Sequence, residues 1–338
     1  MNDSAGLLNL PAAPRLVVVR ALPGLGDFLC SVPALRSLRG AFPRAHITLV
    51  GLPLVQGLAR RFSAYIDTLL PFPGYPGIPE GWGGSAPILP FLQQAQAHRY
   101  HLALQLHGSG LYSNPFTLLL GGERTAGFYR PGDYHPSSNF LPYPEDLPES
   151  DRALALLVAL GVPSQGRDLE FPIQAEERNA YRALTQKLHL KPPYVCLHPG
   201  ASTGDRRWSP EGFAAVGNAL AQRGYSLVLT GTTAERAIAE AMARRLHYPA
   251  LNLAGRTDLG TLAALLEGAA LLVCNDTGVS HLAAALKVPS VVIFSNSDQR
   301  RWAPIDQQRH RAVTRAGEET IPRVLEHCHN LLVAVAYV

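Results

Sequence analysis

The feature that most constrains the fold of this chain is a strand–loop–helix–strand pattern that occurs once in each half. Residues 15–20 (RLVVVR) form a short run of β-branched residues, which predicts a buried strand. A glycine-containing loop at 21–27 and a helical spacing of apolar residues at 28–39 follow, and residues 46–50 (HITLV) predict a second strand. The same order returns at residues 194–197, 198–209, 210–222 and 226–230. Such units are typical of parallel sheets with helical crossovers, so the sequence predicts two similar α/β domains.

Length and composition agree with two globular domains. The chain has 338 residues, of which 47% are hydrophobic and 17% are charged. This is enough apolar material for two cores, and it excludes a disordered chain. We predict an N-terminal Rossmann-like domain at residues 1–168 and a C-terminal one at 169–319. A last helix is predicted at 320–338. We expect this helix to pack back onto the N-terminal domain.

Charge, cysteine spacing and hydropathy exclude several classes of protein. The net charge of +4 is too weak to indicate nucleic-acid binding, although it suits an anionic ligand or an acidic membrane face. The four cysteines are widely spaced and form no CxxC pair, so we expect neither a zinc site nor a disulfide framework. Residues 1–10 lack a signal-peptide pattern, and no apolar run reaches the roughly 20 residues that span a bilayer. We therefore expect a cytoplasmic protein whose association with a membrane, at its inner face, would be peripheral.

The loop of the first unit, LPGLGD at residues 22–27, carries the first candidate site residue. A dinucleotide fingerprint would need a third glycine where Leu29 stands, and no Gly-Lys-Ser/Thr sequence follows. These two facts speak against an NAD-dependent dehydrogenase and against a P-loop. Asp27 stands at the predicted start of a helix, where an N-cap role and a general-base role both fit its carboxylate. The helix dipole would keep that carboxylate ionised.

A second constellation, NDTGVSHLAAA at residues 275–285, leads from a predicted strand into a helix. The first backbone N–H groups of such a helix can hold an anion such as a pyrophosphate, and Gly278 permits close backbone approach. Asp276 or Thr277 can cap the helix. His281 lies about one turn further on, either as a ligand contact or as an ordinary helix histidine. The pattern predicts a diphosphate-binding turn.

Two further loops contribute charged residues. In PGASTGDRRW, at residues 199–208, Arg206 and Arg207 can clamp phosphate oxygens, or the loop can be an ordinary solvated basic loop. In GTTAE, Glu235 opens a helix after a strand, where a carboxylate either takes a ribose hydroxyl or favours the helix dipole.

These segments, in this order, resemble glycosyltransferase family 9, the ADP-heptose:lipopolysaccharide heptosyltransferases. The matching motifs are VVVRALPGLGDFLCSVPALRSLR, PGASTGDRRWSPEGFAAV, LVLTGTTAE, NLAGRTDLGTLAALL and NDTGVSHLAAALKVPSVVIF, followed by DQRRWAP. The segment LALQLHGSG also looks like the acceptor-side segment of the family. The resemblance covers about residues 15–305, and its C-terminal motifs are highly specific.

The resemblance implies the GT-B architecture, in which two Rossmann-like domains face each other across a cleft. It implies an inverting transfer without metal or cofactor, from a nucleotide sugar held by the C-terminal domain to an acceptor held by the N-terminal domain. ADP-heptose is the implied donor and a lipid-linked or oligosaccharide acceptor the implied partner, with no nucleic acid involved. Asp27 matches the catalytic base. The other matched positions are Arg206, Arg207, Asp276, Thr277, Gly278, Val279 and His281 for the donor diphosphate, Thr230, Gly231 and Glu235 for the nucleoside, and Gly24, Gly26, His107 and Ser109 on the acceptor side.

The chain departs from the family pattern at several places. Arg206 stands where the family often has lysine, and Ser295 stands where it usually has glycine. The usual Thr-Asp-Pro is Ser297, Asp298 and Gln299 here, and residues 72–87 have no clear counterpart. The sugar therefore stays open. The alternatives are another GT-B enzyme that uses a UDP- or GDP-sugar, as a transferase or an epimerase, and a catalytically silent GT-B binding protein.

Overall fold

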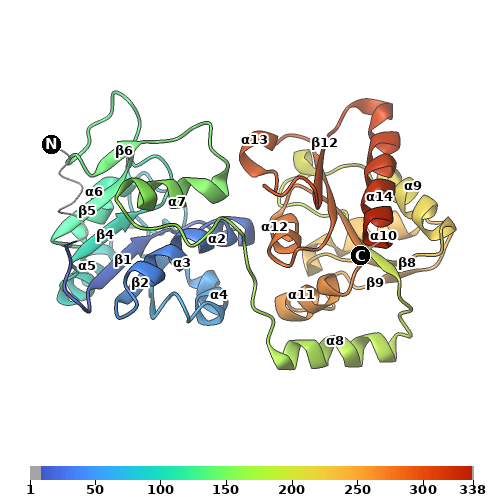
Figure 1. Cartoon of the computed structure of the whole chain (residues 1–338), viewed down its shortest axis with the longest axis horizontal. Coiled ribbons are helices and arrows are strands. Elements are labelled where there is room, and N and C mark those ends of the chain that lie inside the picture. The colour runs from blue at the N-terminus through green and yellow to red at the C-terminus, as the bar shows by residue number, and fades with distance from the viewer. Residues whose placement is uncertain (1–8, 337–338) are drawn as a thin grey trace. The chain divides into compact units, whose positions relative to one another are not determined.

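The computed structural model describes residues 9–336, with side-chain surroundings left out for residue 318 and residues 334–336. The chain divides into two compact units, Met1–Asp168 and Leu169–Val338. Each unit contains one six-stranded sheet whose strands are parallel and are connected by helices (Figure 1). The predicted α/β class, with two Rossmann-like domains, is thereby confirmed.

The elements of the first unit follow one another as strand and helix with few exceptions. Its strands are β1 (Arg15–Val19), β2 (His46–Gly51), β3 (Thr68–Pro71), β4 (Leu102–Gln105), β5 (Arg124–Tyr129) and β6 (Phe140–Pro142). Its helices are α2 (Leu25–Leu29), α3 (Val32–Ala41), the 3-10 turn η1 (Pro53–Val55), α4 (Gln56–Arg61), α5 (Ile88–Ala97), α6 (Ser113–Leu119) and α7 (Glu149–Ala159).

The second unit repeats this alternation. Its strands are β7 (Tyr194–His198), β8 (Ser226–Leu229), β9 (Ala250–Asn252), β10 (Leu271–Asn275), β11 (Ser290–Phe294) and β12 (His310–Thr314). Its helices are α8 (Ala175–Lys187), η2 (Gly204–Arg206), α9 (Pro210–Gln222), η3 (Thr233–Glu235), α10 (Arg236–Ala243), α11 (Leu259–Glu267), α12 (Gly278–Ala285), α13 (Gln299–Trp302), η4 (Gly317–Glu319) and α14 (Thr320–Ala336).

Both sheets have the same strand order. The first is β3-β2-β1-β4-β5-β6 and the second is β12-β11-β10-β7-β8-β9. Counted from the first strand of each unit, both follow the order of doubly wound nucleotide-binding folds, in which ligands bind beyond the carboxyl ends of the strands where the order reverses. These switch points lie between β1 and β4 in the first unit and between β7 and β10 in the second.

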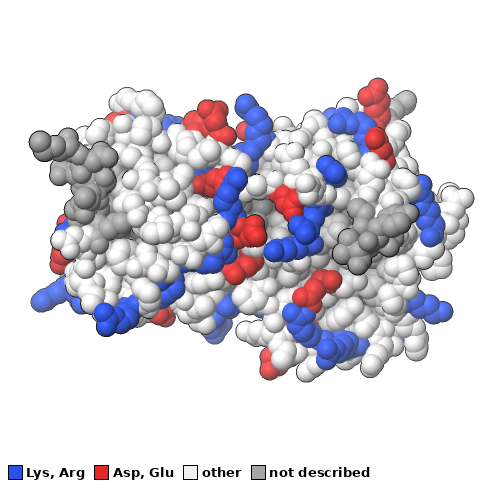
Figure 2. Space-filling model, viewed as in Figure 1, with Lys and Arg blue, Asp and Glu red and all other residues white. Residues whose placement is uncertain are grey.

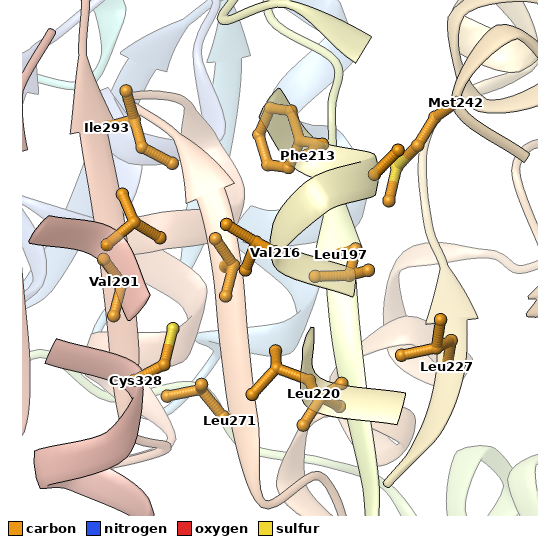
Figure 3. Close-up of a cluster of buried hydrophobic side chains, with 14 of the residues drawn as sticks. Leu197, Phe213, Val216, Leu220, Leu227, Met242, Leu271, Val291, Ile293 and Cys328 are labelled. Atoms are coloured by element: carbon orange, nitrogen blue, oxygen red, sulfur yellow. The ribbon is translucent and has the colours of Figure 1, made fainter. Parts of the chain in front are cut away.

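Each sheet is buried by helices that present apolar side chains. In the first unit Val17 and Val19, which alternate along β1 and so share one face, pack in one cluster with Phe91 of α5 and Phe116 of α6. In the second unit α9, α10 and α14 cover the sheet, and Phe213 of α9 packs in a cluster with strand residues such as those labelled in Figure 3. The central strands β1, β7, β10 and β11 are apolar along most of their length because both faces of a parallel sheet are covered.

The last helix belongs to the core of the second unit. Val324, Cys328, Leu331 and Leu332 of α14 are buried in the cluster that also contains residues of α9, β10 and β11. Within its own unit, α14 supplies an apolar cover over β10–β12. The predicted packing of residues 320–338 on the N-terminal domain stays a prediction.

The helix predicted at residues 28–39 is divided into α2 and α3. Pro33 has no backbone N–H and cannot donate to the carbonyl of Leu29, so the helical hydrogen-bond pattern cannot continue through it. Instead Ser31 becomes the N-cap of α3, and Pro33 lies in the first turn, where a proline is tolerated. The short helix α2 is left as a separate element at the end of β1.

Charged side chains on the face of the molecule shown in Figure 2 are of both signs and lie interspersed. This face therefore gives no single-sign field that would attract a polyanion. Within residues 9–336, no helix has the length and apolarity that crossing a membrane requires.

Candidate active site

Asp27 lies in the first turn of α2 at the switch point of the first unit. The N-cap of α2 is Gly24, and no side chain caps the helix, so the N-cap interpretation of Asp27 is wrong. A Cβ atom on Gly24 would collide with Oδ2 of Asp27, which shows that the half-buried carboxylate folds back over this glycine. Gly26 is buried inside the helix. The predicted acceptor-side glycines thus shape the turn and make room for the carboxylate.

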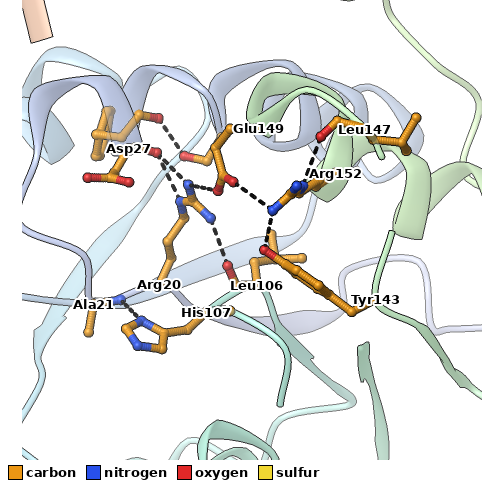
Figure 4. A network of polar contacts seen from close by, with 12 residues as sticks. Arg20, Ala21, Asp27, Leu106, His107, Tyr143, Leu147, Glu149 and Arg152 are labelled. Atoms are coloured by element: carbon orange, nitrogen blue, oxygen red, sulfur yellow. Dashed lines mark hydrogen bonds and ion pairs between the residues drawn. The ribbon is translucent and has the colours of Figure 1, made fainter. Parts of the chain in front are cut away.

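The backbone of Asp27 is held by Arg20, a buried residue directly after β1 (Figure 4). The Nε and Nη2 atoms of Arg20 donate to the carbonyl of Asp27, at 3.0 and 2.8 Å, and Nη1 donates to the carbonyl of Leu106 at 2.8 Å. Nη2 also lies 3.1 Å from Oε1 of the buried Glu149. Arg152 of α7 approaches Oε2 of Glu149 at 3.4 Å. One guanidinium therefore joins α2, the end of β4 and the start of α7.

His107 follows β4 and faces the same loop. Its Nδ1 accepts a hydrogen bond from the backbone N–H of Ala21 at 3.2 Å, which assigns the ring proton to Nε2 in the neutral form. Burial, and to a lesser extent the nearby Arg20 cation, lower the pKa of His107 to about 4. At neutral pH the ring is therefore an uncharged donor through Nε2, which lies 3.6 Å from Oε2 of Glu80. Ser109, the other predicted acceptor-side residue of this loop, is half-buried.

Buried neutral histidines make the stability of the protein depend on pH. The pKa values of His107 and His310 are each lowered by burial from 6.5 to about 4. Below pH 6.5 these histidines bind protons in the unfolded chain but not in the folded chain. Their contribution to stability is therefore fully present above pH 6.5 and is lost as the pH falls toward 4. We expect the free energy of unfolding, measured by urea denaturation, to fall by about 2 kcal/mol per histidine between about pH 7.5 and pH 5.

A variant pair checks the origin of this pH dependence. His310→Gln removes one of the two buried rings and should make the pH dependence distinctly shallower, whereas the exposed His135→Gln should not change it. Equal slopes for the two variants would contradict the assignment.

The switch point of the second unit is held by Asn275, the last residue of β10, which is fully buried. Its Oδ1 accepts from the backbone N–H of Trp208 at 2.9 Å, and its Nδ2 donates to the carbonyls of Pro199 and Gly200 at 2.9 and 3.1 Å. These contacts fix both ends of the loop at residues 199–208. One amide side chain thus sets the shape of the arginine-containing loop relative to the turn that follows β10.

The predicted diphosphate turn leads into α12. Thr277 is its N-cap but makes no side-chain cap hydrogen bond, and Gly278 and Val279 form the start of the helix, where backbone N–H groups have no intrahelical acceptor. His281 is buried one turn along, with its ring centroid 5.9 Å from that of Trp302. The turn has the geometry that holds an anion at a helix N-terminus.

Asp276 lies beside this turn and is only 3% exposed. Its Oδ2 and the hydroxyl oxygen of Ser295 are buried without a hydrogen-bond partner among the described residues, and the Ser297 hydroxyl lies against the Asp276 carboxyl. Burial raises the pKa of Asp276, while the Ser297 hydroxyl and the Arg206 cation lower it by less. Since buried polar groups in folded proteins are nearly always hydrogen-bonded, these oxygens form a polar surface suited to a ligand with hydroxyl groups.

The two adjacent arginines have different surroundings. Arg207 donates from Nε and Nη2 to the carbonyl of Ala201, at 3.0 and 2.9 Å, and so braces its own loop. Arg206 instead acts electrostatically on Asp276. Asp205 accepts a hydrogen bond of 2.6 Å from Asn296, which ties the loop to the segment after β11. Of the predicted pair, Arg206 is the one that the structure brings to the switch point.

The predicted nucleoside residues gather around Glu235. Its Oε2 accepts from the backbone N–H and the hydroxyl of Thr232, at 2.8 and 2.9 Å, and a Cβ on Gly200 would collide with the carboxylate. His198 lies between two of the predicted positions, with Nε2 3.8 Å from Oε2 of Glu235 and Nδ1 3.0 Å from the hydroxyl of Thr230. The structure therefore brings Thr230 and Glu235 together through a buried histidine, and Gly231 adjoins Glu235.

Five residues of these sites were not predicted from the sequence. Three of them had a readable signal, because each is a polar residue at the carboxyl end of an apolar strand, next to the switch point. The other two come from segments far from the motifs and gave no signal. The three residues at strand ends are Arg20, His198 and Asn275. The two without a signal in the sequence are Glu80 and Glu149.

Within the part of the chain that the structure describes, no group of three or more His, Cys, Asp or Glu side chains is placed to hold a metal ion. Arg206 and the start of α12 place positive charge next to the predicted donor site.

Comparison with known proteins places these features in context. The family model described as glycosyltransferase family 9 (heptosyltransferase) matches residues 90–332. Lipopolysaccharide heptosyltransferase 3 of Escherichia coli K12 is 26% identical over 295 residues, which cover 82% of each chain. Among solved structures, a family 9 glycosyltransferase from Veillonella parvula superposes with a TM-score of 0.79 at 20% identity, over 95% of this chain and 98% of that one. The ADP-heptose lipopolysaccharide heptosyltransferase II of E. coli gives a TM-score of 0.74 at 20% identity, over 95% and 99%.

Proposed function

Because the chain belongs to glycosyltransferase family 9, the heptosyltransferase family, we propose that it transfers heptose from ADP-heptose to a lipopolysaccharide-type acceptor. The chain is a glycosyltransferase of the GT-B fold class. The proposed transfer from ADP-heptose rests mainly on the residues found at the two switch points. One presents a carboxylate on a braced helix start, and the other presents an anion-binding helix start beside an arginine.

The chemical step is a direct displacement with inversion at the anomeric carbon. Asp27 takes the proton of an acceptor hydroxyl as that oxygen attacks the anomeric carbon from the face opposite the diphosphate. The bond between this carbon and the diphosphate oxygen breaks, and ADP leaves with the bonding electrons. A carboxylate is a weak base for a hydroxyl, so its position has to be fixed, and the Arg20 contacts to its backbone serve this purpose.

Charge that develops on the departing diphosphate is stabilised within the second unit. The backbone N–H groups of Gly278 and Val279 and the cation of Arg206 are the groups proposed to do this, with Thr277 and His281 alongside. In this proposal they provide the positive charge without a metal ion. Arg207 contributes through the shape of the loop.

Recognition of the donor involves two further groups of residues. The carboxylate of Glu235 is proposed to accept from the ribose hydroxyls, with Thr230 and Gly231 beside it. The buried oxygens of Asp276 and Ser295, with Ser297 beside them, are proposed to bind hydroxyl groups of the transferred sugar. The replacement of the usual glycine by Ser295 then adds a polar contact on this side.

The acceptor is proposed to be a lipid-linked or oligosaccharide sugar bound by the first unit, near His107 and Ser109. An enzyme with such an acceptor would work at the inner face of the cytoplasmic membrane as a peripheral protein.

The test is equilibrium binding of ADP, UDP, GDP, CDP and NAD to the full chain by calorimetry, with and without a chelator. We expect ADP to bind at least about tenfold more tightly than the other nucleotides, a difference of about 1.4 kcal/mol, and equally well with the chelator. Preference for UDP or GDP would keep the glycosyltransferase and change the sugar nucleotide. Binding of NAD alone, or of none of them, would overturn the proposal.

A further inference from the structure

Residues 72–87, which have no clear counterpart in the family pattern, form a closely packed loop of the first unit. Its apolar residues enter the core: Phe72 and Ile78 are buried, and the ring of Tyr75 lies 5.3 Å from that of Phe116. An isolated bridge pairs Tyr75 with Ile78. The loop is therefore a fixed part of the fold rather than an extended connection.

Glycines allow this loop to approach its neighbours closely. Gly77 has a φ of 84°, and a Cβ there would collide with the ring of Tyr112, which lies in the loop that follows β4. Gly74, with a φ of 81°, has room for no Cβ because of the carbonyl of Gly81. Both positions thus require glycine for their backbone conformation and for space. The consequence is that Glu80 is delivered to the switch-point end of β4.

Glu80 meets His107 there. Oε2 of Glu80 is buried and has no hydrogen-bond partner among the described residues, and it lies 3.6 Å from Nε2 of His107. This separation is too long for a hydrogen bond. The proton of the neutral ring is on Nε2, because Nδ1 accepts from Ala21. An unsatisfied acceptor and a donor therefore lie side by side without satisfying one another.

The position of His107 is set by its own backbone contacts. The buried side chain of Gln105 donates from Nε2 to the carbonyl of His107 and approaches the hydroxyl of Ser113. Ser113 donates to the same carbonyl at 2.7 Å. With the ring tied to Ala21 and the carbonyl tied to Gln105 and Ser113, the imidazole cannot easily move to shorten its distance to Glu80.

We propose that Glu80 and His107 together bind one hydroxyl group of a neutral acceptor sugar, and that Glu80 excludes acceptors with an acidic group at that position. The inference rests on the proposed function and names the class of acceptor. A hydroxyl can accept from Nε2–H and donate to Oε2 at the same time, so it satisfies both atoms. A carboxylate or phosphate can accept from the ring but can donate nothing to Glu80.

Charge favours the same ligand. His107 is uncharged, and the guanidinium of Arg20 is engaged by Glu149 and by two backbone carbonyls. The carboxylate of Glu80 therefore repels an anion that enters beside it. The side chain of Glu80 is 23% exposed, so the pair lies close to solvent.

The test uses the full-length chain saturated with ADP and two probes, which are a neutral heptose-terminated core oligosaccharide and the same oligosaccharide with a phosphorylated terminal heptose. Affinities are measured by calorimetry. Wild type is expected to bind the neutral probe more tightly than the phosphorylated one. Glu80→Ala is expected to weaken binding of the neutral probe about tenfold or more, as loss of a hydrogen bond to a charged group does. Glu80→Gln should reduce the discrimination between the probes.

The exposed Glu123→Gln in the same unit is the matched control and should bind both probes as wild type does. Affinity for ADP should be equal in all variants, since Glu80 belongs to the other unit. Loss of ADP binding by wild type would overturn the proposed function. ADP binding with unchanged oligosaccharide affinity in Glu80→Ala, with wild-type preference for the phosphorylated probe, or with no binding of the neutral probe, would overturn this inference alone.

Discussion

Asp27→Asn is expected to lower kcat by about 10²- to 10⁴-fold, the usual contribution of a general base, while the affinity for ADP stays unchanged. Asparagine has nearly the same shape as aspartate. Its side chain can therefore lie over Gly24 as that of Asp27 does, and the Arg20 contacts to the backbone carbonyl are kept. It removes the basic oxygen pair. The activity is measured with ADP-heptose and the acceptor, and ADP binding is measured by calorimetry.

Asp146→Asn, an exposed position of the same unit, is the control and should retain full activity. If Asp27→Asn lost stability or ADP affinity together with turnover, Asp27 would be a structural residue. If it retained turnover, another group would have to take the proton.

Arg20→Met is expected to destabilise the protein by about 3 kcal/mol, at the lower end of the range for breaking a buried ion pair. The variant leaves the carboxylate of Glu149 buried, and the compensation by Arg152, at 3.4 Å, is only partial. It also frees the carbonyls of Asp27 and Leu106, which lose their donors. The loss is measured from the midpoint and slope of urea denaturation.

Two companion variants separate the causes. Arg130→Met breaks an exposed pair with Glu145 and should change stability by less than about 0.5 kcal/mol. The double variant Arg20→Met/Glu149→Met should recover part of the loss, because no uncompensated buried charge remains. If the double variant loses as much stability as the two single variants together, then the lost carbonyl contacts, and not the ion pair, cause the effect.

The sequence predicted the layout of the fold well because both sheets are parallel and covered on both faces. Strands such as β1 and β7 are then continuous apolar runs that end in a loop with glycine, and such runs are easily recognised. The break between α2 and α3 was missed although its cause, Pro33, is visible. The packing of α14 against the second sheet was not predicted, since an apolar helical face does not say which sheet it covers.

Site residues that belong to sequence motifs were predictable. Site residues that only tertiary packing brings together were not. Asp27, Asp276 and Glu235 lie in the segments that follow β1, β10 and β8, and parallel topology brings such segments to one edge of a sheet. Arg20 and Glu149 are 129 residues apart, so their contact has no local pattern. The position of Glu80 depends on how the loop at residues 72–87 packs, which composition alone does not determine.

Gly24 and Gly200 also have a consequence for how this protein can change under selection. At each position the obstacle to a methyl group is the tip of a carboxylate side chain, that of Asp27 or Glu235. A flexible side chain can turn aside, so the fold would tolerate alanine at little cost, but the carboxylate would no longer lie where it does now. A lineage selected only to stay folded would let these glycines drift, and one selected for turnover would keep them. Whether a descendant of this chain has kept the two glycines therefore indicates whether it was selected for turnover or only for folding.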